Sequence, residues 1–137
     1  MKVYVLDACA LMAVLYREKG ASVVKAAFDE ADKGKAKIIM HKANLLEVYY
    51  DILRNLGKEK ADAIISEIKK RPISFNAEIT DEIFIEASRL KSSYKISFAD
   101  SFALAQALIS GGSLLTSDHH EFNVIEGKES IHFAWIR

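Results

Sequence analysis

The apolar residues of the chain fall into short runs that alternate with longer, helically spaced stretches. We predict short buried strands at residues 3–6, 37–40, 73–75, 113–116 and 131–134. We predict helices over about 8–16, 22–32, 45–56, 58–70, 81–91 and 98–109, with one more short helix after Asp118. Short apolar strands that alternate with helices indicate an α/β fold. The expected architecture is a single-domain α/β/α sandwich around a short, mainly parallel sheet.

Two of these helices have patterns that bear on the site. The stretch 98–109 is apolar nearly all round, so we expect it to be buried. The stretch 45–56 has one apolar face, formed by Leu45, Leu46, Val48, Tyr49, Ile52, Leu53 and Leu56. Glu47 falls opposite this face, and periodicity alone places it in solvent. Asn44 precedes Glu47 by three residues, a spacing that allows a helix cap.

Composition narrows the class of protein. The 137 residues fit one domain that spans 1–137, and no repeat or linker divides them. Lys+Arg and Asp+Glu number 19 each, which argues against binding to nucleic acid by bulk positive charge but leaves room for a local basic face. The single cysteine, Cys9, excludes an intrachain disulfide and indicates a reducing compartment. No membrane span is expected, and Asp7 comes too early for a signal-peptide core, so we expect a soluble, cytoplasmic protein.

Three acids stand out by their positions. Asp7 and Asp118 each follow a predicted strand, and the carboxyl ends of parallel strands are where such folds bind ligands. Asp100 lies in the first turn of the apolar helix, where an unpaired charge is costly and a bound cation would remove the cost. Each acid also has a structural interpretation as a helix cap, and Ser97 with Asp100 has the spacing of a capping box. The grouping of all three at one sheet edge favours a site.

Other polar residues near these acids have two possible roles, one functional and one structural. The pattern around Glu47 favours a structural role on the surface. His119 and His120 adjoin Asp118, so a role as ligand or proton carrier competes with the favoured interpretation of exposed residues at a helix start. Ser97, Thr116 and Ser117 either orient the carboxylates or contact phosphate, or else only cap helices.

Four segments of the chain resemble the motifs of PIN-domain ribonucleases, in particular the VapC-type toxins, in order and in spacing. They are Val3–Leu11, Asn44–Tyr50, Ile96–Ala105 and Leu114–Phe122, which contain Asp7, Glu47, Asp100 and Asp118 respectively. The resemblance implies that these acids converge on one pocket that binds Mg²⁺ or Mn²⁺. Asp7, Asp100 and Asp118 would be the metal ligands, and Glu47 would hold water or a second ion. The chain departs from many relatives at Cys9, where they carry Ser or Thr.

The resemblance also implies an activity and partners. It predicts an endoribonuclease of a type II toxin–antitoxin pair, which forms a homodimer and is held by an antitoxin segment across the acidic groove. We place the dimer surface on the helices that carry Tyr49, Tyr50 and Ile64. A PIN-like binding module without catalysis and a housekeeping RNA-processing nuclease remain alternatives. A haloacid-dehalogenase phosphatase is disfavoured, because its second Asp would stand where this chain has Cys9.

Overall fold

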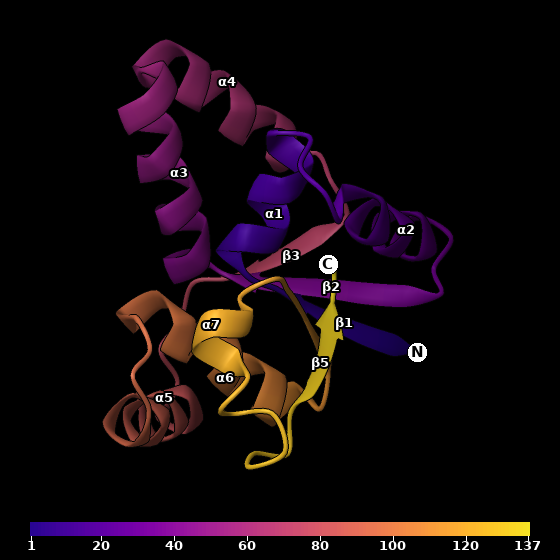
Figure 1. The fold of residues 1–137 in the computed structure, drawn as a ribbon. Helices are drawn as coiled ribbons and strands as arrows, with labels where there is room; N and C mark the ends of the chain where they lie inside the picture. Colours follow the sequence, from indigo (N-terminus) through magenta and orange to yellow (C-terminus); the bar gives the residue numbers. More distant parts are fainter.

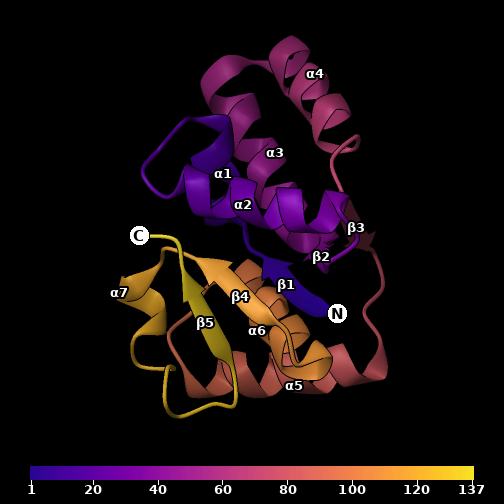
Figure 2. The ribbon, with the colours of Figure 1, turned by 90° about the vertical axis from the view of Figure 1, so that its right-hand side faces the viewer.

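A computed structural model describes all residues, 1–137, and its centre is a five-stranded parallel sheet. The strands are β1 (Lys2–Leu6), β2 (Ala36–His41), β3 (Ile73–Asn76), β4 (Ser113–Thr116) and β5 (His132–Trp135). Their order across the sheet is β3-β2-β1-β4-β5, and every neighbouring pair is parallel. Figure 1 shows the whole fold, and Figure 2 labels all five strands. Val5 pairs with Ile39 on one side and with Leu114 on the other. The chain therefore reverses its direction of progress across the sheet at β1 and β4, whose carboxyl ends lie side by side.

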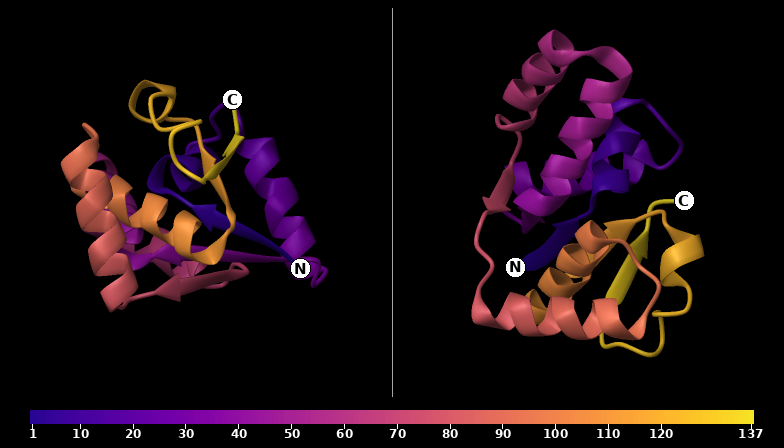
Figure 3. Two further views of the ribbon diagram at one scale, coloured as in Figure 1. Left: turned by 90° about the horizontal axis from the view of Figure 1, so that it is seen from below. Right: turned by 90° about the vertical axis from the view of Figure 1, so that its left-hand side faces the viewer.

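Seven helices cover the two faces of this sheet. They are α1 (Ala8–Leu15), α2 (Ala21–Asp32), α3 (Lys42–Leu56), α4 (Lys58–Ile68), α5 (Asp81–Ser93), α6 (Phe98–Ser110) and α7 (His119–Phe122). The helices α1 to α4 lie on one side, and α5 and α6 lie on the other (Figures 2 and 3). None of them combines the length and the apolar character that crossing a membrane requires. The predicted α/β/α sandwich is confirmed.

Two hydrophobic cores follow from the alternation of side chains along β1. Tyr4 and Leu6 point into the core formed with α1 to α4, whereas Val5 points into the core formed with α5 and α6. Ile38 and Leu114 extend these two cores on the neighbouring strands. Because β1 and β4 are buried on both faces over most of their length, they appear as continuous apolar runs in the sequence, which is why their positions were predictable.

The predictions of burial were wrong in part for two helices. The middle of α6 is buried, but Phe98 at its start is 71% exposed and Ile109 near its end is 40% exposed. On α3 the core face consists of Leu45, Val48 and Ile52, while Leu46 is 64% exposed. Successive residues of a helix are about 100° apart, so a leucine next to a core position falls outside a narrow buried face.

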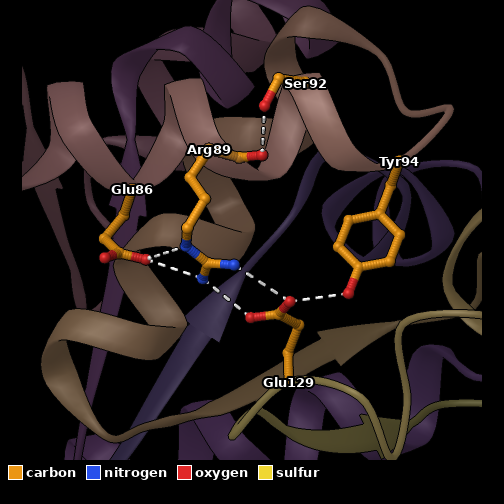
Figure 4. Close-up of polar contacts among 5 residues, drawn as sticks. All are labelled: Glu86, Arg89, Ser92, Tyr94 and Glu129. Atoms are coloured by element: carbon orange, nitrogen blue, oxygen red, sulfur yellow. Dashed lines mark hydrogen bonds and ion pairs between the residues drawn. The ribbon is translucent and has the colours of Figure 1, made fainter.

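An ion-pair network holds the segment before β5 against α5 (Figure 4). The guanidinium of Arg89 donates to both carboxylate oxygens of Glu129, at 3.1 and 2.8 Å, and also to Glu86. The Tyr94 hydroxyl donates to the same Glu129 carboxylate at 2.7 Å. These bonds lower the pKa of Glu129, chiefly through Arg89. The network thereby fixes the loop that leads into the last strand.

Candidate active site

Asp7 lies at the carboxyl end of β1 and is the N-cap of α1. Its Oδ1 accepts a hydrogen bond from the backbone N–H of Ala10 at 2.9 Å. The side chain is buried, and burial is the main reason that its pKa is raised from 3.8 to about 6. The hydroxyl of Thr116, the N–H of Ala10 and the thiol of Cys9 oppose this rise, while the charge of Asp100 adds to it. The site therefore keeps a carboxylate in a place that disfavours its negative charge.

Asp118 lies two residues beyond the end of β4 and caps the short helix α7. Its Oδ1 accepts from the backbone N–H of Glu121 at 3.1 Å, and its own N–H donates to the Thr116 hydroxyl at 3.1 Å. Thr116 is fully buried at the last position of β4. The buried hydroxyl thus fixes the turn that carries Asp118 from the strand to the cavity.

Asp100 is held by the capping box at the start of α6. Its N–H donates to Ser97 Oγ at 3.0 Å, and the Ser97 N–H donates to Asp100 Oδ2 at 3.4 Å. The capping interpretation of this pair is therefore correct, and it does not remove Asp100 from the cavity. Burial, followed by the charges of Asp118 and Glu121, raises the pKa of Asp100 against the lowering effect of Ser97.

Glu47 comes from α3 and is half-buried, not solvent-facing as its periodicity predicted. Its pKa is raised from 4.5 to about 7, first by burial and then by the charges of Asp100, Asp7 and Asp118. Glu47 differs from the three aspartates because no hydrogen bond holds its carboxylate. The Glu47 side chain is therefore less constrained than the side chains of Asp7, Asp100 and Asp118.

All four acids predicted from the sequence line one cavity of about 230 Å³. We call this cavity the acidic pocket, and its remaining lining residues are Ala8, Cys9, Ser97 and Glu121. None of its five carboxylates forms an ion pair with Lys, Arg or His. The mutual repulsion of these carboxylates is therefore left uncompensated by the protein's own side chains.

The chemistry of this donor set fits a hard divalent cation. Mg²⁺ prefers carboxylate oxygens, keeps several waters, and takes only one or two carboxylates directly. In the observed conformation no three acidic, histidine or cysteine side chains are close enough to ligate one ion together. A site that uses one or two carboxylates and water does not require such a triad. The uncompensated charge in the acidic pocket is what such an ion would neutralise.

Cys9 connects the two strand ends that carry Asp7 and Asp118. Its Sγ accepts from the backbone N–H and the hydroxyl of Ser117, both at 3.4 Å, and lies 3.5 Å from Thr116 Oγ1. Burial and the charge of Asp7 raise the pKa of the thiol to about 12. Cys9 is thus a neutral S–H group at neutral pH, not a nucleophile.

Sequence reasoning missed Glu121, but it placed His119 and His120 correctly at the surface. Glu121 follows Asp118 by three residues, so both lie on one side of α7, and this spacing is the signal that could have found it. His119 is exposed and does not line the acidic pocket. Its ring stacks on Trp135 at 3.8 Å and its nitrogens contact Asn123 and the carbonyl of Arg137. His120 is also exposed.

Larger cavities exist elsewhere but lack this concentration of like charge. One of about 570 Å³ lies beside Arg89 and Glu129, where acids and bases are paired. Another of about 410 Å³ is an apolar groove between α5 and α6, next to the exposed Phe84 and Phe98. The acidic pocket is therefore distinguished from the larger cavities by its chemistry and not by its volume.

Comparisons with known proteins agree on the fold. A family model for the PIN domain matches residues 4–128, whereas a search of curated protein sequences finds no match. A chain of VapBC2 from Rickettsia felis, solved with a DNA fragment from its promoter, is 14% identical with a TM-score of 0.77 over 97% of this chain and 98% of that one. A chain of DNA-bound VapBC from Salmonella typhimurium is 12% identical with a TM-score of 0.74 over 100% of both chains. Mycobacterium tuberculosis VapC20, a sarcin–ricin loop cleaving toxin, is 14% identical with a TM-score of 0.57 over 81% of this chain and 86% of its own.

At these identities the solved structures establish a common fold and nothing finer. The match to the PIN domain model shows the family of the chain, since it spans residues 4–128 of the 137 and includes all four acids predicted from the sequence. The carboxyl ends of β1 and β4, the capping box of Ser97 and Asp100, and the acidic pocket all lie within the matched segment. This chain belongs to the PIN domain family.

Proposed function

We propose that this protein is a metal-dependent endoribonuclease that hydrolyses phosphodiester bonds in RNA. One observation carries the proposal, namely five carboxylates without a cationic partner in a single pocket at the carboxyl edge of the sheet. A phosphodiester substrate is itself an anion, so such a pocket needs a cation before RNA can approach. Membership of the PIN domain family supports the same activity.

In this proposal Asp7, Asp100 and Asp118 hold Mg²⁺ or Mn²⁺. Their carboxylates are fixed by the backbone N–H of Ala10, by Ser97 and by the N–H of Glu121, so they are preorganised to receive a cation. When bound, the cation supplies a nucleophile at neutral pH and neutralises charge on the phosphate.

Glu47 has a different role in the proposal. Without a hydrogen bond to restrain it, its carboxylate is free to take a proton from the attacking water or to meet a second ion. In the proposal Ser97 orients Asp100 and Thr116 orients Asp7, whereas Ser117 acts on Asp7 through the thiol of Cys9. The whole chain, residues 1–137, acts as one PIN domain.

We propose further that the protein is the toxin of a type II toxin–antitoxin pair. Support comes from similar folds in VapBC structures from Rickettsia felis and Salmonella typhimurium and in a toxin–antitoxin complex from Klebsiella pneumoniae. The expected antitoxin places a basic side chain among the unpaired carboxylates, and the protein forms a homodimer. A housekeeping nuclease and a silent PIN-like module are the competing accounts.

The test is cleavage of total RNA by the purified, antitoxin-free protein. Reactions contain Mn²⁺, Mg²⁺ or EDTA, and Asp7→Asn is the matched control because it keeps the shape of the side chain and removes its charge. Discrete cuts that disappear with EDTA and with Asp7→Asn support the nuclease and identify the RNA. Absence of cleavage, together with absence of metal binding, would leave the silent module as the better account.

A further inference from the structure

Asn44 is a fully buried polar residue whose hydrogen bonding is incomplete. Its side chain is 0% exposed on α3. The Nδ2 atom donates to the carbonyl of Ala99 at 3.0 Å, while Oδ1 has no partner. The capping role expected for Asn44 belongs instead to His41, whose Nδ1 accepts from the N–H of Ala43 at 3.0 Å. Capping of α3 therefore does not explain why a polar side chain is buried at position 44.

The one bond that Asn44 makes joins the two helices that bear Glu47 and Asp100. Glu47 follows Asn44 by three residues, which places both on neighbouring parts of one side of α3. Ala99 directly precedes Asp100 in the first turn of α6. The hydrogen bond thus links positions that are each within one helical turn of an acid in the pocket.

Stability does not account for Asn44. A buried acceptor without a partner costs about 1–3 kcal/mol, which is as much as the single hydrogen bond returns. The carbonyl of Ala99 also has a backbone partner one turn further along an α-helix, so it does not depend on the amide. The contact of His41 with Phe102, at 4.7 Å between ring centroids, already packs the start of α3 against α6.

We propose that Asn44 is a positioning residue, which fixes the spacing of Glu47 and Asp100 by tying α3 to the first turn of α6. The inference rests on the proposed function, in which Asp100 is a metal ligand and Glu47 acts beside it. The Asn44–Ala99 bond stops the two helices from sliding against each other under the repulsion between their carboxylates. It thereby holds Asp100, a proposed metal ligand, and Glu47 in fixed positions in the acidic pocket.

The experiment compares Mn²⁺ affinity, by calorimetry, with thermal stability of the metal-free protein. Asn44→Leu keeps the branched shape and removes both the donor and the unpartnered acceptor. We expect its Mn²⁺ dissociation constant to rise about tenfold, as for outer-shell residues of metal sites, while its unfolding temperature does not fall. Asn44→Ala, which removes the amide without adding volume, should weaken Mn²⁺ binding to a similar extent.

Gln106→Leu is the matched control. Gln106 is the other buried amide with an unpartnered oxygen, and it lies on α6 outside the acidic pocket. Its replacement should leave Mn²⁺ affinity unchanged. Unchanged affinity in Asn44→Leu, an equal loss in Gln106→Leu, or failure of both Asn44 variants to fold would overturn the inference. Absence of Mn²⁺ binding by the wild-type protein would instead overturn the proposed function on which it rests.

Discussion

The thiol of Cys9 donates to both oxygens of the Asp7 carboxylate, with Sγ 3.2 Å from Oδ1 and 3.3 Å from Oδ2. The same sulfur accepts from the N–H and hydroxyl of Ser117, the residue that directly follows β4. One small side chain therefore orients the acid at the end of β1 and fixes the loop that follows β4.

Substitution of Cys9 should separate hydrogen bonding from packing. Cys9→Ser keeps a donor toward Asp7, so we expect Mn²⁺ affinity and cleavage close to those of the wild type. Cys9→Ala removes the donor and should weaken Mn²⁺ binding by about tenfold, in the range found for groups that orient metal ligands. Calorimetry with Mn²⁺ measures both variants, and equal affinity of the alanine and serine variants would show that the thiol only fills space.

The raised pKa values predict an unusual dependence of stability on pH. The pKa of Asp7 is about 6 and that of Glu47 about 7 in the folded protein, both above their ordinary values of 3.8 and 4.5. Between the ordinary and the raised value the folded state binds more protons, so stability falls as pH rises. From about pH 4 to about pH 7 the metal-free protein should therefore lose unfolding free energy, with a slope of at most about 1.4 kcal/mol per pH unit for each carboxyl.

Denaturant unfolding at several pH values measures this loss. Because the pKa of His119 is also raised and has the same sign of effect, Asp7→Asn and Glu47→Gln isolate the two acids. Each variant should flatten part of the decline, Glu47→Gln chiefly near pH 7. Addition of Mn²⁺ should restore stability at the higher pH, since the ion binds the ionised carboxylates. A metal-free protein that gains stability over the same interval would contradict the assignment.

The network around Arg89 predicts a loss of stability without a loss of activity. Glu129→Gln replaces the 11% exposed carboxylate that accepts from Arg89 and Tyr94. Since Arg89 itself is 43% exposed and partly screened by solvent, we expect a loss of about 1–2 kcal/mol of unfolding free energy. RNA cleavage by the folded variant should be unchanged, because Glu129 does not line the acidic pocket.

Lys58→Met provides the comparison for this network. Lys58 and Asp62 form an ion pair whose side chains are 76% and 50% exposed. Its removal should cost no more than about 0.5 kcal/mol. If urea unfolding gave the same small loss for Glu129→Gln, the loop before β5 would not depend on the network.

The fold could be predicted from the sequence because strands that are buried on both faces of a parallel sheet consist of short apolar runs. Each strand appears as an apolar run, and Asp7 and Asp118 could be placed at strand ends by counting from those runs. Their gathering in one pocket follows from β1 and β4 being neighbours. Their roles in catalysis remain a prediction.

Glu47 and Asn44 could not be placed in this way. Helical periodicity distinguishes a core face from the rest, and it assigns every polar residue of the rest to solvent. Glu47 faces an acidic pocket that forms only when α3 packs near α6, and Asn44 is buried at the same junction by its bond to Ala99. Phe98 shows the opposite failure of the pattern. It belongs to a helix that is apolar on nearly all sides, yet its side chain is exposed.

The central claim is that the acidic pocket holds a divalent cation, and Mn²⁺ binding measured by calorimetry tests it most directly. We predict saturable Mn²⁺ binding by the wild-type protein. The Mn²⁺ affinity should fall by at least about tenfold in Asp7→Asn and in Asp100→Asn. It should be unchanged in Glu129→Gln, because the Glu129 carboxylate lies in the Arg89 network. Absence of binding by the wild type, or equal binding by the wild type and Asp7→Asn, would contradict the account.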